Sequence, residues 1–226
     1  MAKKPFWEDS YRNTGPANAF ADGKPSPELY DLVKGLHQGA RVLDLGCGDG
    51  RNALFLAENG FDVTAVDTSA AGIEKLQRLA DTRGLSIRTE IHDIRTYDFK
   101  TTYDLIIVHG SLHLIERDYW VPLLKDIKSY TNLGGYNVIA VFTDKIPPPD
   151  DLRNFTVGLF REQELFEFYE DWSIQLRQSY VLEDQHPGGI RHTHPINKLV
   201  ARKELQDLLN THGTDRIPDT PWTPDS

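Results

Sequence analysis

The stretch VLDLGCGDGRN, residues 42–52, is a short apolar run followed by glycines at alternating positions and then by a helical pattern. The glycines, Gly46, Gly48 and Gly50, allow backbone conformations that other residues rarely adopt, and they let a ligand approach the main chain closely. A strand, a glycine loop and a helix in this order predict a cofactor-binding loop. The loop differs from the dinucleotide fingerprint G-x-G-x-x-G, because Arg51 stands where the third glycine would be.

Short β-rich runs alternate with segments of helical period on both sides of this loop. The runs expected as strands are ARVLDLG, FDVTAVD, SIRTEIHD, YDLIIVH and GYNVIAVFT. The apolar helix faces between and after them are Ile73, Leu76, Leu79 and Ala80, then Trp120, Leu123, Leu124 and Ile127, then Leu165, Phe168, Tyr169 and Trp172. This alternation predicts an α/β fold with a parallel sheet wrapped by helices on both faces.

Two further runs, SIQLRQSYVLED and PINKLVARK, follow without a helix between them. Strands joined so directly predict an antiparallel pair at one edge of the sheet, which makes seven strands in all. The connection between them, HPGGIRHTHP, would turn at Pro187, Gly188 and Gly189. Loops of this kind often carry functional residues.

The length of 226 residues predicts one domain with additions at its ends. We expect an aromatic flap over residues 1–28, the main domain over 29–203, and a partly disordered tail over 204–226, which is rich in proline. The sequence leaves open whether the protein is a monomer or a homodimer.

The net charge of −9 argues against nucleic acid as the partner, because a phosphate backbone requires clustered Lys and Arg. A small-molecule substrate is therefore expected. No apolar run suits a signal peptide or a membrane span, so a cytoplasmic location is expected. The single cysteine, Cys47, has no neighbouring base and is interpreted as a small buried turn residue.

Two carboxylates lie at the ends of the first two predicted strands. Asp67 ends the second strand, where it could accept hydrogen bonds from ribose hydroxyls, as also occurs in nicotinamide enzymes. Asp44 separates the alternatives, because a carboxylate beside the glycine loop repels a pyrophosphate and attracts an ammonium group or a sulfonium centre.

These residues resemble the class I S-adenosylmethionine-dependent methyltransferases, which have a Rossmann-like fold. The resemblance covers residues 40–143 through DLGCGDG, Asp67, HDI, YDLIIVHG and GGY. It implies that the cofactor is S-adenosylmethionine, with Asp44 near the methionine amino group and Asp67 on the ribose. It also implies that Asp93 and the backbone of Ile94 read the adenine. The predicted cofactor site is completed by Gly46, Cys47, Gly48, Thr68 and His109.

A closer resemblance is to the tellurite-resistance, or TehB-like, family of small methyltransferases. It covers most of residues 40–203 through GCGDGRNALFLAENGFDVTAVD, FTVGLFREQELFEFYEDW and NKLVARK. The family implies methylation of small, soft nucleophiles, namely tellurium and selenium species and, in relatives, sulfur compounds.

The resemblance also places Arg191 where the family carries a functional arginine just before the last strand. An arginine can bind an oxyanion bidentately and orient its lone pair, which suits a displacement governed by positioning. The family's neighbouring histidine lies further upstream than His186, so equating the two requires a gap. With that gap allowed, we predict Arg191 and His186 as catalytic residues.

The segment also contains His192 and His194, whose side chains would point to the same side of an extended strand. Three interpretations remain open for them: substrate-pocket residues, metal ligands together with His186, or solvated loop residues. We predict the first and no metal site. Tyr11, with Phe6 and Trp7, would either close over the sulfonium as an aromatic lid or pack on the sheet.

The segment HGSLHLI, residues 109–115, supplies His109 and His113 beside the expected position of the methyl group. Either could act as a base near neutral pH, or His113 could simply begin the next helix. The leading hypothesis is a methyltransferase for a small soft nucleophile, and the alternative is an oxygen or nitrogen acceptor with a histidine base. A third hypothesis is a non-catalytic protein that binds S-adenosylmethionine or a metal.

Overall fold

The structure, a computed structural model, describes residues 6–12, 23–185 and 191–205. The elements follow in the order α1 (Phe6–Tyr11), α2 (Leu29–Gly35), β1 (Arg41–Leu45), α3 (Arg51–Glu58), β2 (Asp62–Asp67), α4 (Ala70–Thr82), β3 (Ile87–Ile91), β4 (Tyr103–His109), α5 (Arg117–Ser129), β5 (Thr131–Phe142), α6 (Glu164–Phe168), β6 (Ser173–Gln185) and β7 (Arg191–Arg202). None of the helices in this described part combines the length and apolarity that a membrane crossing requires.

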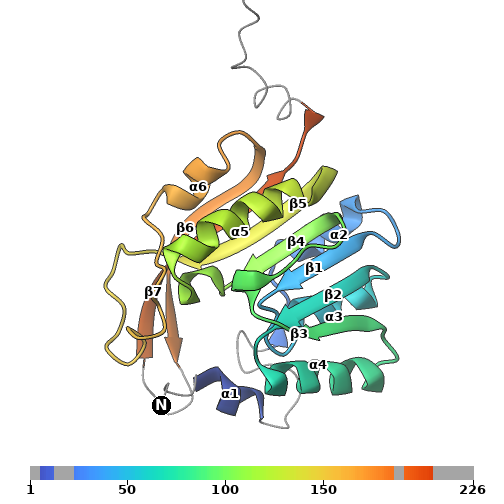
Figure 1. The fold of residues 1–226 in the computed structure, drawn as a ribbon, viewed down its shortest axis with the longest axis horizontal. Helices are drawn as coiled ribbons and strands as arrows, with labels where there is room; N and C mark the ends of the chain where they lie inside the picture. Colours follow the sequence, from blue (N-terminus) through green and yellow to red (C-terminus); the bar gives the residue numbers. More distant parts are fainter. Residues whose placement is uncertain (1–5, 13–22, 186–190, 206–226) are drawn as a thin grey trace, which may run out of the picture.

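Seven strands form one sheet in the order β3-β2-β1-β4-β5-β7-β6 (Figure 1). The first five strands along the chain are parallel, whereas β7 is antiparallel to both β5 and β6. The sequence prediction of a mostly parallel sheet with an antiparallel last pair is therefore confirmed. The strand order reverses at β1, because β2 and β3 lie on one side of it and β4 and β5 on the other. In such sheets ligands bind at the carboxyl ends of the strands where the order reverses, and the carboxyl end of β1 lies at this point.

The sheet is buried on both faces because its central strands are apolar almost throughout. Along β1, Leu43 and Leu45 pack on the face covered by α5 and α6, and Val42 packs on the opposite face. Helices α2, α3 and α4 contribute the second layer, which is built on residues such as Leu54 and Leu76. The helices cover both faces, as the fold class predicts.

Three details differ from the sequence prediction. Helix α6 ends at Phe168, so Tyr169 and Trp172 are buried core residues outside the helix. Strand β5 begins at Thr131, earlier than expected. Strand β7 begins at Arg191, so the histidine-bearing segment belongs to the strand. The predicted turn at 187–189 lies outside the described residues.

The contact between α4 and the glycine loop fixes the loop against the sheet. A Cβ atom added to Gly72, in α4, would lie 2.7 Å from the carbonyl oxygen of Gly48. A Cβ atom added to Gly35, in α2, would meet nothing within 4 Å. The two helical glycines therefore differ in the space around them.

We predict that Gly72→Ala lowers the free energy of unfolding by about 1–3 kcal/mol, because overpacking outweighs the helix propensity of alanine. Gly35→Ala should leave it unchanged or raise it, since no neighbour has to move. Urea unfolding of both variants measures the difference. An equal gain in both would show that the α4 contact is not tight.

Candidate functional site

The glycine loop occupies the crevice at the carboxyl ends of β1 and β4. Gly46, Gly48 and Gly50 have positive φ angles of 74°, 58° and 87°, as the sequence pattern requires. A Cβ atom at Gly46 would lie 2.5 Å from Ser111, and one at Gly48 would lie 2.5 Å from the hydroxyl of Tyr11. The missing side chains thus let Ser111 and Tyr11 pack directly on the backbone of the loop.

Asp67 ties this loop to the end of β2. Its Oδ2 accepts a hydrogen bond from the Gly48 amide at 2.8 Å, and its Oδ1 accepts one from the Ser69 amide at 2.8 Å. Burial raises the pKa of the carboxyl, and the backbone hydrogen bonds oppose this effect. Each carboxylate oxygen retains a lone pair, so Asp67 can still accept a ribose hydroxyl.

Asp44 is buried beside the loop with an unsatisfied oxygen. Its side chain is 2% exposed, and Oδ2 has no hydrogen-bond partner. Burial raises its pKa to about 7, while the positive charge of Arg51 opposes the rise and Asp67 adds to it. A buried carboxylate without a full set of partners is costly, which suggests that a positively charged ligand group completes the site.

Arg51 and His109 form a second polar pair that sequence reasoning did not assign. Nη2 of Arg51 donates to Nδ1 of His109 at 3.0 Å, and Nη1 donates to the carbonyl of Lys24 at 2.9 Å. The proton of His109 is therefore on Nε2, a buried atom with no hydrogen-bond partner. Burial, and then the charge of Arg51, lowers the pKa of His109 well below 6.5.

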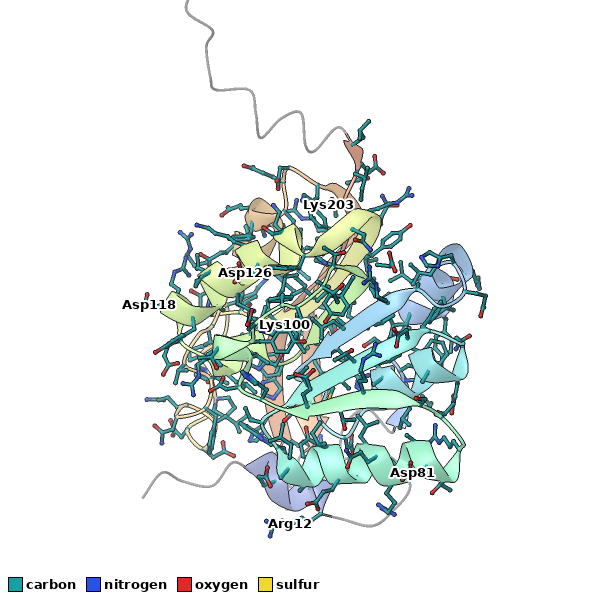
Figure 2. All side chains as sticks on the ribbon, turned by 45° about the vertical axis from the view of Figure 1, so that its right-hand side comes forward. Arg12, Asp81, Lys100, Asp118, Asp126 and Lys203 are labelled. Atoms are coloured by element: carbon teal, nitrogen blue, oxygen red, sulfur yellow. The ribbon has the colours of Figure 1, made fainter. Side chains whose placement is uncertain are left out.

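Helix α1 covers the crevice from the side of α4. Tyr11 approaches both Gly48 and Gly72, and the ring of Trp7 packs edge-on against Phe155 at a centroid distance of 5.6 Å. Figure 2 shows α1, which ends near Arg12, beside the amino-terminal end of α4, whereas Asp81 marks the other end of that helix. Burial, followed by the charge of Asp67, raises the pKa of Tyr11. These contacts place Trp7 and Tyr11 where an aromatic lid would lie, and that role stays a prediction.

A stack of buried rings lies beyond the carboxyl ends of β4 and β5. His113 stacks on Phe142 at 3.9 Å, and Phe142 stacks on His194 at 4.3 Å, each with an interplanar angle of 16°. The ring of His192 meets that of His194 edge-on at 5.7 Å, and its Nε2 lies 3.1 Å from Oδ2 of Asp151. Asp151 belongs to the segment between β5 and α6, so this contact holds that segment against β7.

The contacts of His113 suit a packing role in this stack better than the role of a general base. Its Nδ1 accepts a hydrogen bond from the Phe142 amide at 3.3 Å. Burial, together with the nearby His194, lowers its pKa to about 3. An imidazole with so low a pKa accepts a proton poorly at neutral pH, so the geometry gives little support to a basic role for His113.

Arg191 is exposed and opens strand β7. The last residue of β5, Phe142, pairs with Ile196, so residues 191–195 run on past the carboxyl edge for roughly 17 Å at about 3.4 Å per residue. Figure 1 shows β6 and β7 extending beyond β5 in this way. Arg191 therefore lies at the same edge as the glycine loop, and His186 lies outside the described residues.

The remaining predicted cofactor residues have local roles in the structure. Asp93 caps the 3-10 turn Ile94–Thr96 and accepts hydrogen bonds from the backbone and guanidinium of Arg95, which lower its pKa. Ile94 and Cys47 are buried, and burial raises the pKa of the Cys47 thiol. Thr68 is exposed. Their roles at the cofactor stay predictions.

The charged and imidazole side chains do not gather as a metal site in the ranges 6–12, 23–185 and 191–205. In these ranges no three His, Cys, Asp or Glu side chains come together as metal ligands. His192 instead pairs with Asp151, and His194 with the ring of Phe142. The site of the described chain is thus made of carboxylates, glycines and stacked rings.

The fold and the glycine-loop crevice are those of class I methyltransferases. The sequence profile described as "Tellurite resistance protein TehB" matches residues 19–185. A "Probable S-adenosyl-L-methionine-dependent methyltransferase TehB" from Haemophilus influenzae is 39% identical over 136 residues, 59% of this chain and 46% of the relative. The crystal structure of TehB from Haemophilus influenzae has a TM-score of 0.71 at 30% identity, covering 79% of this chain and 62% of that one.

The chain belongs to the TehB family, since the profile covers well over half of it. This finding confirms the predicted family and fold, and the TehB relatives are described as S-adenosylmethionine-dependent methyltransferases. A "2-heptyl-1-hydroxyquinolin-4(1H)-one methyltransferase" from Mycobacteroides abscessus is more distant, at 28% identity over 64% of this chain and 67% of the relative. The chain spans about half the length of the curated TehB relatives that it matches.

The residues present fit S-adenosylmethionine on two observations. The unpaired Oδ2 of Asp44 is a buried acceptor suited to the methionine ammonium, and the unpaired Nε2 of His109 is a buried donor suited to its carboxylate. Asp67 then remains for the ribose.

We predict that the free energy of unfolding falls as the pH rises, and that Asp44 is the main cause of this fall. Its folded pKa of about 7 exceeds the ordinary 3.8, so folding binds a proton between these values. The stabilisation is complete below the unfolded pKa and is lost as the pH rises through the folded one. The free energy of unfolding of the ligand-free protein should therefore fall by up to about 1.4 kcal/mol per pH unit in this window.

Urea unfolding from about pH 4 to about pH 8 measures this slope. Asp44→Asn should remove most of it, whereas Asp81→Asn, at an exposed carboxylate of α4, should retain it. A wild-type slope that Asp44→Asn leaves unchanged would contradict the proposed state of this carboxyl.

Proposed function

We propose that the protein transfers a methyl group from S-adenosylmethionine to a small soft nucleophile, namely a tellurium, selenium or sulfur compound. The observation that carries the proposal is the buried ring stack beside the cofactor crevice, in which the pKa of His113 is lowered to about 3. An imidazole with so low a pKa removes protons from a substrate poorly at neutral pH. It suits an acceptor whose lone pair is already available.

S-adenosylmethionine, when bound, supplies a methyl group attached to a positively charged sulfur. Asp44 and Asp67 bring two buried carboxyl groups to the same crevice, and the ionised form of each favours a cationic ligand. Trp7 and Tyr11, on α1, cover the crevice and help to exclude water from it. The chain thus contributes binding and orientation, which dominate an in-line displacement.

The acceptor would lie between this crevice and the stack of His113, Phe142 and His194. These rings offer polarisable faces, and burial keeps His113 uncharged at neutral pH, which suits a soft atom. We propose that Arg191 binds the oxygen atoms of an oxyanion acceptor from the projecting start of β7. The family profile ends at residue 185 and does not reach Arg191. The support for this role is the position of Arg191 at the start of β7, together with the family resemblance of the sequence around it.

An oxygen or nitrogen acceptor would require a base within reach of its proton. Burial lowers the pKa of both His109 and His113, the residues that this alternative needs. The structure therefore favours the soft acceptor over the alternative.

We predict formation of S-adenosylhomocysteine when the protein is given S-adenosylmethionine and tellurite or selenite. After correction for the ionisation of the acceptor itself, kcat/KM should show no inflection from a histidine base between about pH 6 and about pH 8. Arg191→Ala should lower kcat/KM for an oxyanion roughly 10- to 100-fold, because a charge-assisted pair is lost.

Arg78→Ala, at another exposed arginine, is the matched control and should leave kcat/KM unchanged. Normal turnover of Arg191→Ala would contradict the role of Arg191. Turnover only with hydroxyl or amine acceptors would contradict the soft-nucleophile proposal. Tight binding of S-adenosylmethionine without turnover of any acceptor would support a non-catalytic function.

A further inference from the structure

Strand β6 forms the edge of the sheet opposite β3 (Figure 1). It is 13 residues long and pairs with β7 along nearly all of its length. Within the residues that the structure describes, no strand pairs with its outer side. Proteins rarely leave so long an edge open, because its unpaired N–H and C=O groups can recruit another strand.

The same edge carries a run of exposed apolar side chains. Tyr180, Val181 and Leu182 are 38%, 50% and 40% exposed, and they are consecutive in the strand. Because alternate residues point to opposite faces, Tyr180 and Leu182 lie on one face of the sheet and Val181 on the other. A partner must therefore contact both faces, as a paired strand does.

A groove beside the edge extends this surface. It has a volume of about 1060 Å³ and lies between α2 and the strands β5, β7 and β6. A buried ion pair between Lys198 and Glu28, with a separation of 2.9 Å, forms part of its floor, and Tyr180 and Leu176 lie in its wall. The described helices thus leave this part of the sheet face uncovered next to the open edge.

We propose that two copies of this chain pair through β6, antiparallel and centred on Tyr180, so that their sheets join into one. A two-fold axis perpendicular to the sheet would place Tyr180 against the same residue of the partner subunit. Leu182 would lie diagonal to that tyrosine on the groove face, within reach of its ring. The exposed apolar run of each copy would then be covered by the other.

The charges of β6 support this register. With Tyr180 at the centre, Arg177 of one copy stands opposite Glu183 of the partner subunit, and the two-fold axis repeats the pair. Both residues have the same parity within the regular ladder from Leu176 to Gln185, so both point to the same face. Cross-strand pairs of opposite charge stabilise such a ladder.

Arg177 is already held on that face. Its guanidinium lies 4.4 Å above the ring centroid of Phe166 and donates a hydrogen bond to Gln163. Holding the side chain there reduces the entropy lost when a partner carboxylate approaches. A register centred on Val181 would instead place Ser179 opposite Glu183 and give up the ion pairs.

Sedimentation equilibrium of the full chain tests the dimer, with an expected mass of twice 25.7 kDa. Tyr180→Lys places like charges opposite each other at the axis and should raise the dissociation constant at least tenfold. Leu133→Lys, at an apolar residue of β5 that is 53% exposed, is the matched control and should remain dimeric. A wild-type monomer at about 100 µM, or a dimer unaffected by Tyr180→Lys, would overturn the proposal.

Two further variants test the register. Oxidised Tyr180→Cys should form a covalent dimer, since directly opposed Cα atoms are about 4.5–5.5 Å apart, within disulfide range. Val181→Cys should cross-link less. Glu183→Arg should weaken the dimer, and Arg177→Glu combined with Glu183→Arg should restore it. Preferential cross-linking through Val181→Cys, or no restoration by the double variant, would overturn the register centred on Tyr180.

Discussion

The hydrogen bonds from the Gly48 and Ser69 amides to Asp67 join the glycine loop to the end of β2. The rest of the crevice depends on this join, because it fixes the loop over the ends of two parallel strands and buries Asp44 beside it. Gly72 then packs against the carbonyl of Gly48, and α1 covers the loop through Tyr11. The cost of burying two carboxylates so close together is offset only in part by backbone donors and Arg51. A cationic ligand would offset more of it.

The other half of the crevice has the opposite character. His113, Phe142 and His194 form a stack of rings in which burial keeps His113 neutral. Asp151 reaches this stack from the segment after β5 and contacts His192. A half that contains the buried carboxyl groups therefore lies at the same edge as a half made of stacked rings, and residues from distant parts of the chain build the second half.

The sequence predicts the fold and the half that contains the carboxyl groups well, because both depend on local patterns. Apolar strands, a glycine loop and carboxylates at strand ends are all visible within about twenty residues of each other. The pairing of Arg51 with His109 and of His192 with Asp151 joins residues far apart, which no local pattern indicates. Strand β7 begins earlier than predicted because its buried face there consists of imidazoles, which count as polar in a hydropathy pattern.

The most direct test of the central claim is calorimetric titration of S-adenosylmethionine at about pH 6.5 in buffers of different ionisation enthalpy. At this pH an α-amino group with a pKa of about 7.7–8.0 is already protonated. Asp44, with a pKa of about 7, is also mostly protonated and has to lose its proton to pair with the ammonium. If the ammonium pairs with Asp44, binding should release most of one proton, and Asp44→Asn should bind more weakly without this release. Equal proton release and affinity in Asp44→Asn, or no binding by the wild-type protein, would contradict the account.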